Sequence, residues 1–478
     1  MNISNSLTEN IATAKKLLPI GTSFDFITRN LKIQDTGVYF IGINGLNNQD
    51  LLQKVLFQMQ RSNGNSPLED LRDFAAANIG FGQVTLTSEW ETIIQNVLSG
   101  PCVLFFDGFY DAIILDTRTY PVRGIEEPEN EKVLRGSKDG FVETLLFNTN
   151  LIRRRIRSNA LTFEIFNLGK KSHMDVAIAY DASLADLEFV EKLKDKLNSI
   201  HASSLTMGTK SLEELLIPRK WFHPLPATFR TERPDVACSY LMEGYVLLMV
   251  DTTPSCIILP CNIFQFTQSP EDYYKSPLIG NYIRFFRFVC FFLSLFLLPV
   301  FLLFTTSPSL LPAGINLLPT GNLSPLQLFI YVLFAELLLD LFKYSSSHAP
   351  GGFSGAFSIV GGLLIGDVAV SLNWASKEII FYAAATMLAS LGLNNIDFSD
   401  AIRMYRLFLI LLTGLFGLPG FLTGVFLITL SVITTPGFLK KSYFWPLFPP
   451  DWSALKTLLF RYPTIMSQPN TIKRQNKN

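Results

Sequence analysis

The amino-acid sequence predicts an α/β N-terminal region in two lobes, followed by an all-α polytopic membrane domain. The first observation is an uncharged apolar run of seventeen residues from Phe288 to Phe304, which follows a long part of mixed composition. The second is that three more apolar stretches follow, at 353–372, 379–393 and 407–433. A helix needs about 20 apolar residues to cross a bilayer core about 30 Å thick. The third is that, before these stretches, short apolar runs alternate with segments of helical apolar spacing.

The first lobe is expected to cover residues 1–157. Its short apolar runs predict strands, two of which are joined by a turn at Asp107 and Gly108; the strands cover residues 37–43, 103–106 and 112–115. Segments with helical apolar spacing predict helices at 48–60, 88–98 and 138–156. Ser88, with Glu91 three residues later, has the pattern of a capping box at the start of the second helix.

The second lobe is expected to cover residues 158–282, because a new set of strands and helices begins near Arg157. The predicted strands cover residues 161–166, 175–180, 245–250 and 256–259. Between them, residues 184–199 have strong helical spacing and a mixed-charge outer face. The two lobes together form the predicted α/β region.

The membrane domain is expected to cover residues 283–436, with a tail at 437–478. The first 30 residues lack an apolar secretion signal, so the N-terminal lobes are expected in the cytoplasm. Lys and Arg are enriched on the cytoplasmic side of membrane helices. Six passes satisfy this rule if residues 325–342 return inward and 407–433 fold as a hairpin about 417–420. In a four-pass alternative, 325–342 lie at the far interface and 407–433 form one tilted helix, which places Arg403 and Arg406 on the opposite side.

Composition and motifs argue against several classes of function. Forty basic and forty acidic residues balance, which speaks against nucleic acid as the main partner. Five cysteines lack paired spacing and are expected to be free thiols, and four scattered histidines form no metal motif. The sequence lacks a Walker loop, a GxSxG motif and a GxGxxG motif. We therefore expect no enzyme activity, no cofactor and no bound metal.

Three carboxylates within the membrane domain are candidates for an ion pathway. Glu336 and Asp340 are four residues apart and share one helix face, whereas Asp367 follows a glycine-rich segment. An ionised group at membrane depth costs about 2.5–3.5 kcal/mol on insertion scales, so it normally faces a bundle interior or water. The alternative is that Glu336 and Asp340 lie at an interface and that Asp367 pairs with Lys377 near a span end.

Small residues predict close helix packing in the same region. Gly362 and Gly366 have the spacing of a small-xxx-small motif, and Gly361 precedes them. Because glycine lets helix backbones approach closely, this segment is expected to be buried in protein. The pattern is also common in ordinary helix packing.

A charged stretch before the second lobe is a candidate contact between subunits. It contains Glu126, Glu127 and Arg135, and the arginines of the next helix end are Arg153, Arg154 and Arg155. One interpretation is that these groups exchange ion pairs with a neighbouring copy or bind anionic lipid. The alternative is a solvated loop and arginines that stabilise a helix C-terminus by about 0.3–1 kcal/mol.

Several short motifs occur in one order between about residue 100 and residue 435. They are EEP at 126–128, VLRG at 133–136, DGFVET at 139–144, NTNLIRRRIR at 148–157, ERPDV at 232–236, DTTP at 251–254 and GGLLIG at 361–366. In this order they resemble the A-subunit family of spore germination receptors (GerA type). Tyr120, Pro121 and Asp367 resemble the stage V sporulation AF branch of that family.

The resemblance implies a multi-pass protein of the bacterial spore inner membrane, with its N-terminal domain on the cytoplasmic side. It also implies a homo-oligomeric ring that works with a small membrane partner or with other germinant receptor subunits. Our leading hypothesis is a channel subunit that conducts monovalent cations across the lipid bilayer during germination. The alternative is a non-conducting scaffold that clusters germinant receptors.

Overall fold

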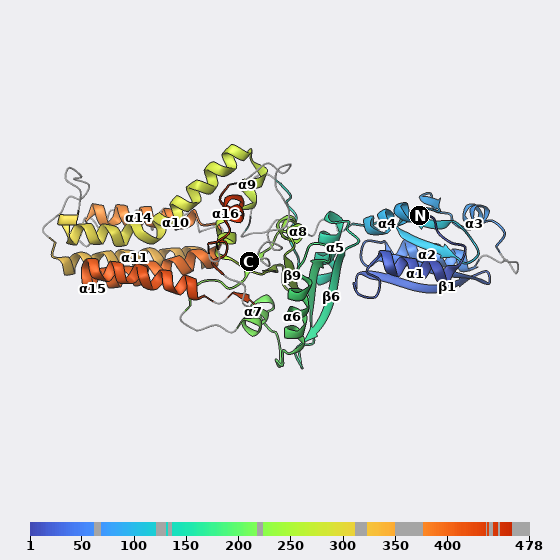
Figure 1. The fold of residues 1–478 in the computed structure, drawn as a ribbon, viewed down its shortest axis with the longest axis horizontal. Helices are drawn as coiled ribbons and strands as arrows, with labels where there is room; N and C mark the ends of the chain where they lie inside the picture. The colour runs from blue at the N-terminus through green and yellow to red at the C-terminus, as the bar shows by residue number, and fades with distance from the viewer. Residues whose placement is uncertain are drawn as a thin grey trace. The chain divides into compact units, whose positions relative to one another are not determined.

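The computed structural model describes residues 1–61, 68–120, 131, 136–217, 223–310, 323–348, 376–435, 437–438, 443–447 and 450–460. These residues form two compact units. The first contains the described residues of Met1–Pro218 and Thr228–Cys261, and the second contains those of Arg219–Ala227 and Asn262–Ser467. The first unit is α/β and the second is helical, so the predicted fold class is confirmed (Figure 1).

The first sheet of unit 1 has helices on both faces. Its antiparallel strands lie in the order β1 (Phe26–Ile33), β2 (Thr36–Ile43), β4 (Cys102–Phe106), β5 (Ala112–Leu115) and β3 (Val84–Thr87). One face packs against α1 (Leu7–Leu17) and α4 (Trp90–Ser99), and the other against α2 (Gln49–Arg61) and α3 (Leu71–Asn78). On β4, Val103 and Phe105 face the first layer, whereas Leu104 and Phe106 face the second. This two-sided burial explains why β4 is a continuous apolar run.

The second sheet of unit 1 repeats this strand arrangement. Its antiparallel strands lie in the order β6 (Leu161–Leu168), β7 (Met174–Asp181), β9 (Val246–Val250), β10 (Cys256–Leu259) and β8 (Phe229–Thr231). Its helices are α5 (Leu145–Arg155), α6 (Leu187–Asn198), α7 (Thr209–Leu216) and α8 (Pro234–Met242). Helix α5 packs against α8 and β9 (Figure 1).

The predicted strands are confirmed, but two predicted helix starts are wrong. The helix expected at 138–156 begins only at Leu145, because the preceding backbone has other partners: Phe141 N donates to Glu232 O and Val142 N to the Asn148 carboxamide. Helix α4 begins at Trp90 without the predicted capping box. The N-cap position is Glu89, one residue after Ser88, and the Ser88 carbonyl accepts instead from Ile3 N of the N-terminal segment.

Helices that pack side by side dominate unit 2 (Figure 1). The long ones are α10 (Pro277–Thr306), α11 (Pro325–His348), α14 (Lys377–Leu391) and α15 (Ile396–Thr434), and the short ones include α9 (Pro270–Tyr274) and α16 (Trp452–Leu459). Among the described residues, α10, α11 and α15 are long and apolar enough to cross a membrane. Leu298, Val332, Ala383 and Ile410, one from each long helix, meet in a shared core.

Helix α15 reverses direction at Gly417. This residue has φ 62° and ψ −136°, a conformation open to glycine and strained for other residues. Residues on either side of the reversal meet again, since the Tyr405 and Ser431 hydroxyl oxygens are 2.9 Å apart. The hairpin predicted about 417–420 is therefore confirmed. The number of membrane spans and the domain limits given above stay predictions.

Candidate functional site

Three ion pairs connect α11 to the first arm of α15, and we call them the ion-pair ladder. Lys343 Nζ is 3.2 Å from Asp400 Oδ1 in the outer rung. In the middle rung, Arg403 Nη1 is 3.2 Å from Asp340 Oδ1. In the inner rung, Arg406 Nε donates to Glu336 Oε1 over 2.8 Å.

The spacing of these residues explains the ladder. The α11 members lie at positions 336, 340 and 343 and the α15 members at 400, 403 and 406, so each set shares one helix face. The order of partners runs in opposite directions along the two helices, as expected for antiparallel neighbours. From position 336 to position 343 the ladder rises about 10 Å, at 1.5 Å per residue.

Solvent exposure falls along the ladder. The exposed side-chain fractions are 31% and 45% for Lys343 and Asp400 in the outer rung. They are 27% and 23% for Arg403 and Asp340, and only 4% and 3% for Arg406 and Glu336. The ladder therefore extends from a solvent-exposed end of the bundle into its apolar interior.

The inner rung is complete within the chain. Arg406 Nη1 donates to Ser294 O over 2.8 Å and to the Ser294 hydroxyl over 3.2 Å, so α10 shares in holding this guanidinium. Its other nitrogens donate to the Glu336 carboxylate. A buried charge is tolerated when it is paired and its hydrogen bonds are satisfied. Removing either partner would leave the other charge buried and uncompensated.

A small cavity lies beside the ladder. It has a volume of about 10 Å³, close to the smallest that accepts one water molecule. Residues of α14 and α15 line it together with the ladder, among them Met387, Ser390 and Ser399. Arg403 Nε is buried and has no hydrogen-bond partner among the described residues, so a water here would have a donor to bind.

A second buried charge group lies at the start of α10. Arg287 donates to both carboxylate oxygens of Asp272, over 2.9 and 3.0 Å. Arg284 Nε is 3.4 Å from the same carboxylate, and Arg284 Nη1 donates to Leu458 O of α16 over 2.8 Å. The three charged side chains are at most 4% exposed. This group joins the base of α10 to both α9 and α16.

The arginines at the end of α5 have three different environments. Arg153 is fully buried, and its Nε is 2.9 Å from the Asp25 carboxylate. Arg154 is exposed and lies 4.6 Å from the Tyr120 ring centroid. Arg155 pairs with Asp139 at 2.5 Å. Because Arg153 has no exposed surface, a direct contact of this residue with a neighbouring copy is not part of our proposal.

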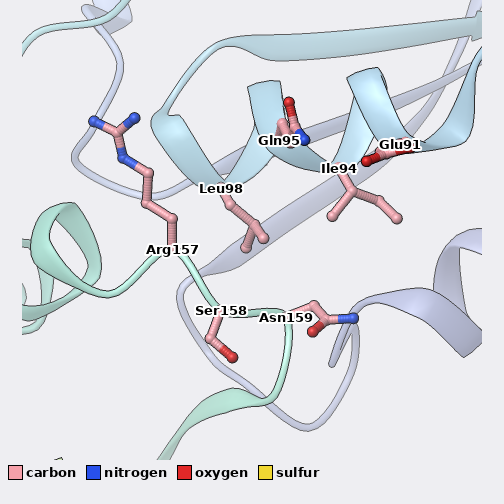
Figure 2. Close-up of a pocket in the computed structure, with 7 residues that line it drawn as sticks. All are labelled: Glu91, Ile94, Gln95, Leu98, Arg157, Ser158 and Asn159. Carbon is pink, nitrogen blue, oxygen red and sulfur yellow. The ribbon is translucent and has the colours of Figure 1, made fainter. Parts of the chain in front are cut away.

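A shallow cleft of about 440 Å³ lies between α4 and the segment that follows α5. Ile94 and Leu98 point from α4 toward Ser158 and Asn159, whereas the Arg157 guanidinium turns away (Figure 2). Glu91 and Gln95 complete the lining. These residues contain no nucleophile beside a base, so the cleft does not indicate catalysis. The described residues also contain no cluster of metal-ligating side chains.

Several predicted site residues lie outside the described residues. They are Asp367, Gly361, Gly362, Gly366, Glu126, Glu127 and Arg135. Of the predicted ion-pathway residues, the structure places Glu336 and Asp340 on one face of α11, as their spacing indicated. Sequence reasoning missed their pairing with Arg406 and Arg403. The signal was present, since acids and arginines recur at matching intervals on two apolar segments.

Comparisons with known proteins agree with the motifs. The profile of the family described as Bacillus/Clostridium GerA spore germination protein matches residues 14–471. Stage V sporulation protein AF of Bacillus subtilis (strain 168) is 31% identical over 466 residues, which cover 97% of this chain and 94% of that protein. Spore germination protein KA of the same organism is 28% identical over 484 residues, covering 99% and 88%.

One solved structure also resembles the chain. The N-terminal domain of the A subunit of the Bacillus megaterium spore germinant receptor GerK3 matches 54% of this chain and 96% of its own, with 24% identity and a TM-score of 0.41. The family profile covers most of the chain, and the resemblance drawn from the motifs is confirmed. This chain belongs to the GerA family of spore germination proteins.

Proposed function

We propose that this protein is an oligomeric channel subunit that conducts monovalent cations across the spore inner membrane during germination. The observation that carries the proposal is the line of carboxylates inside an apolar bundle, with Asp340 and Asp400 still partly exposed. Ionised groups within a membrane bundle are costly to bury, and they are found on ion and proton pathways of membrane proteins. The family membership supports a role in germination. We propose no catalytic activity.

The proposed assembly is a homo-oligomeric ring in which Asp340 and Asp367 attract cations; Glu336, predicted with them, is neutralised by Arg406 and is only 3% exposed, so its part in the proposal is to hold the bundle beside the passage. Gly361, Gly362 and Gly366 would pack helices closely around the passage. In the N-terminal lobes, Glu126 and Glu127 would meet Arg154 and Arg155 of a neighbouring copy, and Arg135 would lie at the same contact. A small membrane partner or germinant receptor subunits would complete the complex.

Ion flux from proteoliposomes tests the proposal. The full-length protein, with its membrane partner where one is needed, should release K⁺, and the Asp340→Asn and Asp367→Asn variants should release it more slowly. Asp340 pairs with Arg403, so the control must show that the variant still assembles. Asp35→Asn is the matched control, because this exposed carboxylate lies in unit 1. Equal flux in all variants would remove the pathway role of these acids.

A scaffold that clusters germinant receptors is the second candidate. The ladder contains three acidic and three basic residues, so the described part of the bundle has no surplus negative charge here. This balance suits a rigid support as well as a pathway. A scaffold would pass no ions in liposomes under any condition, yet its loss would disperse receptor clusters in spores.

A further inference from the structure

The outer rung of the ion-pair ladder has the opposite polarity to the other two rungs. In the outer rung, α11 provides the base Lys343 and α15 provides the acid Asp400. In the middle and inner rungs, α11 provides the acids and α15 provides the arginines. The charge sequence along each helix is therefore not uniform.

This reversal penalises a sliding motion of α15 along α11. If α15 moved by one rung in one direction, Asp400 would face Asp340. If it moved by one rung in the other direction, Arg403 would face Lys343. Each displaced alignment thus brings two like charges together inside a bundle, where their repulsion is screened less than in water. The observed alignment has opposite charges in every rung.

Packing beyond the ladder follows the same alignment. Phe329 of α11 lies against Gly414 of α15, and a Cβ atom at Gly414 would overlap the Phe329 ring. As the α11 position falls from 343 through 340 and 336 to 329, its partner position on α15 rises from 400 through 403 and 406 to 414. One antiparallel alignment therefore satisfies the ring contact and all three ion pairs.

We propose that the ladder is a register lock that admits a single longitudinal alignment of α11 and α15, with Lys343 and Asp400 as its positioning residues. Buried polar groups are best attested in this registry role. A motion that slides these two helices past each other is then disfavoured, whereas motions of both helices as one body are not. The inference does not depend on whether the protein conducts ions.

Cysteine cross-linking of the full-length protein in lipid nanodiscs tests the lock. Leu333→Cys with Ile410→Cys reports the observed alignment, and Leu333→Cys with Leu407→Cys or Thr413→Cys reports the two displaced ones. With native rungs, only the first pair should link efficiently. In the swap Lys343→Asp/Asp400→Lys, every rung keeps opposite charges but both displaced alignments become attractive as well. We expect the displaced pairs to link in this variant.

The swap Asp340→Arg/Arg403→Asp is the matched control. It also keeps opposite charges in all rungs, yet each displaced alignment still contains one pair of like charges, so only the first pair should link. If the outer swap does not fold, Lys343→Met/Asp400→Met removes the same repulsions and should release the displaced links. The lock is overturned if the outer variants keep a single alignment, or if the middle swap releases the displaced links equally.

Discussion

At the scale of single residues, charge burial decides most of the local chemistry of this chain. Arg153 illustrates this, because one buried guanidinium connects the two sheets of unit 1. It pairs with Asp25, which precedes β1, and donates to Ser158 O and Leu161 O at the start of β6. The Phe163 ring lies 5.1 Å from the guanidinium carbon. The two sheets thus share a polar centre with no access to water.

Arg153→Leu should destabilise unit 1 by about 3–5 kcal/mol, because it leaves the Asp25 carboxylate buried without its partner. Urea unfolding of the full-length protein, followed by tryptophan fluorescence, measures the loss. Arg157→Leu is the matched control, because this arginine is exposed near the same helix end and should change stability little. A small effect of Arg153→Leu would mean that water reaches Asp25.

Glu131 predicts a dependence of stability on pH. Burial raises the pKa of its carboxyl, although Thr231 Oγ1 and Glu232 N donate to it. The folded state therefore holds the proton more tightly than the unfolded state does. Its contribution is most favourable below the unfolded pKa of about 4.3 and is lost as pH rises through the raised folded pKa.

Glu131→Gln should remove the loss of stability at higher pH, since the amide carbonyl can accept the same hydrogen bonds without a charge. Unfolding free energies at a series of pH values compare the variant with the native protein. The gain from the substitution should grow as pH rises. A constant difference across the series would contradict a raised pKa.

The cysteines also show how burial controls the chemistry of single side chains. All five are free and buried, as predicted for reduced thiols. Burial raises the pKa of Cys102 and of Cys238 to about 12. Because the thiolate is the reactive form, these side chains should be inert to alkylation while the protein is folded.

At the scale of elements, α15 uses two glycines in different ways. Gly417 has open space where a Cβ would lie but a positive φ, whereas Gly414 lacks space because the Phe329 ring occupies it. Gly417→Ala should therefore destabilise the hairpin by about 1–3 kcal/mol through backbone strain alone. Thermal denaturation in nanodiscs measures both variants. The stability lost in Gly414→Ala should be partly restored by Phe329→Leu, whereas the stability lost in Gly417→Ala should not be restored by this substitution.

Strands with an unbroken run of apolar residues could be predicted from the sequence, whereas a strand whose run is broken by polar residues could not. Strand β4 is buried on both faces, so its unbroken run of apolar residues is distinctive. Strand β1 was missed because it is an edge strand with exposed Arg29 and Asn30, which break the apolar pattern. Glu336 and Asp340 were placed on one face by their spacing. Their partners Arg403 and Arg406 lie more than 60 positions away in the sequence, so the matching intervals alone did not show which acid meets which arginine.

At the scale of the whole molecule, the helical unit constrains how the chain crosses a membrane. The end of α11 lies beside the start of α15, where Lys343 meets Asp400. The start of α14 lies beside the end of α10, where Tyr382 stacks on Phe301. Residues 348 and 377 therefore belong to opposite ends of the bundle. Both topologies need this, because a span lies between these residues in each, but the reversal of α15 at Gly417 supports our proposal of six passes over the four-pass alternative, in which 407–433 form one helix.

Site-directed labelling tests this topology. With six passes, Ser345→Cys should react with a membrane-impermeant maleimide from the cytoplasmic side of sealed vesicles and Ser376→Cys from the opposite side, whereas four passes would exchange the two sides. The native cysteines are buried and should contribute little background. Labelling of Ser345→Cys from the outer side and of Ser376→Cys from the cytoplasmic side would reject six passes in favour of four.

The hydrogen bond from Arg284 to Leu458 O has a practical consequence for anyone who shortens this protein. A truncation that removes Trp452 and the residues after it also removes this acceptor of the Arg284 guanidinium, which is buried near the start of α10. Loss of function in the truncated chain would then reflect a destabilised α10 and not a separate activity of the C-terminal tail.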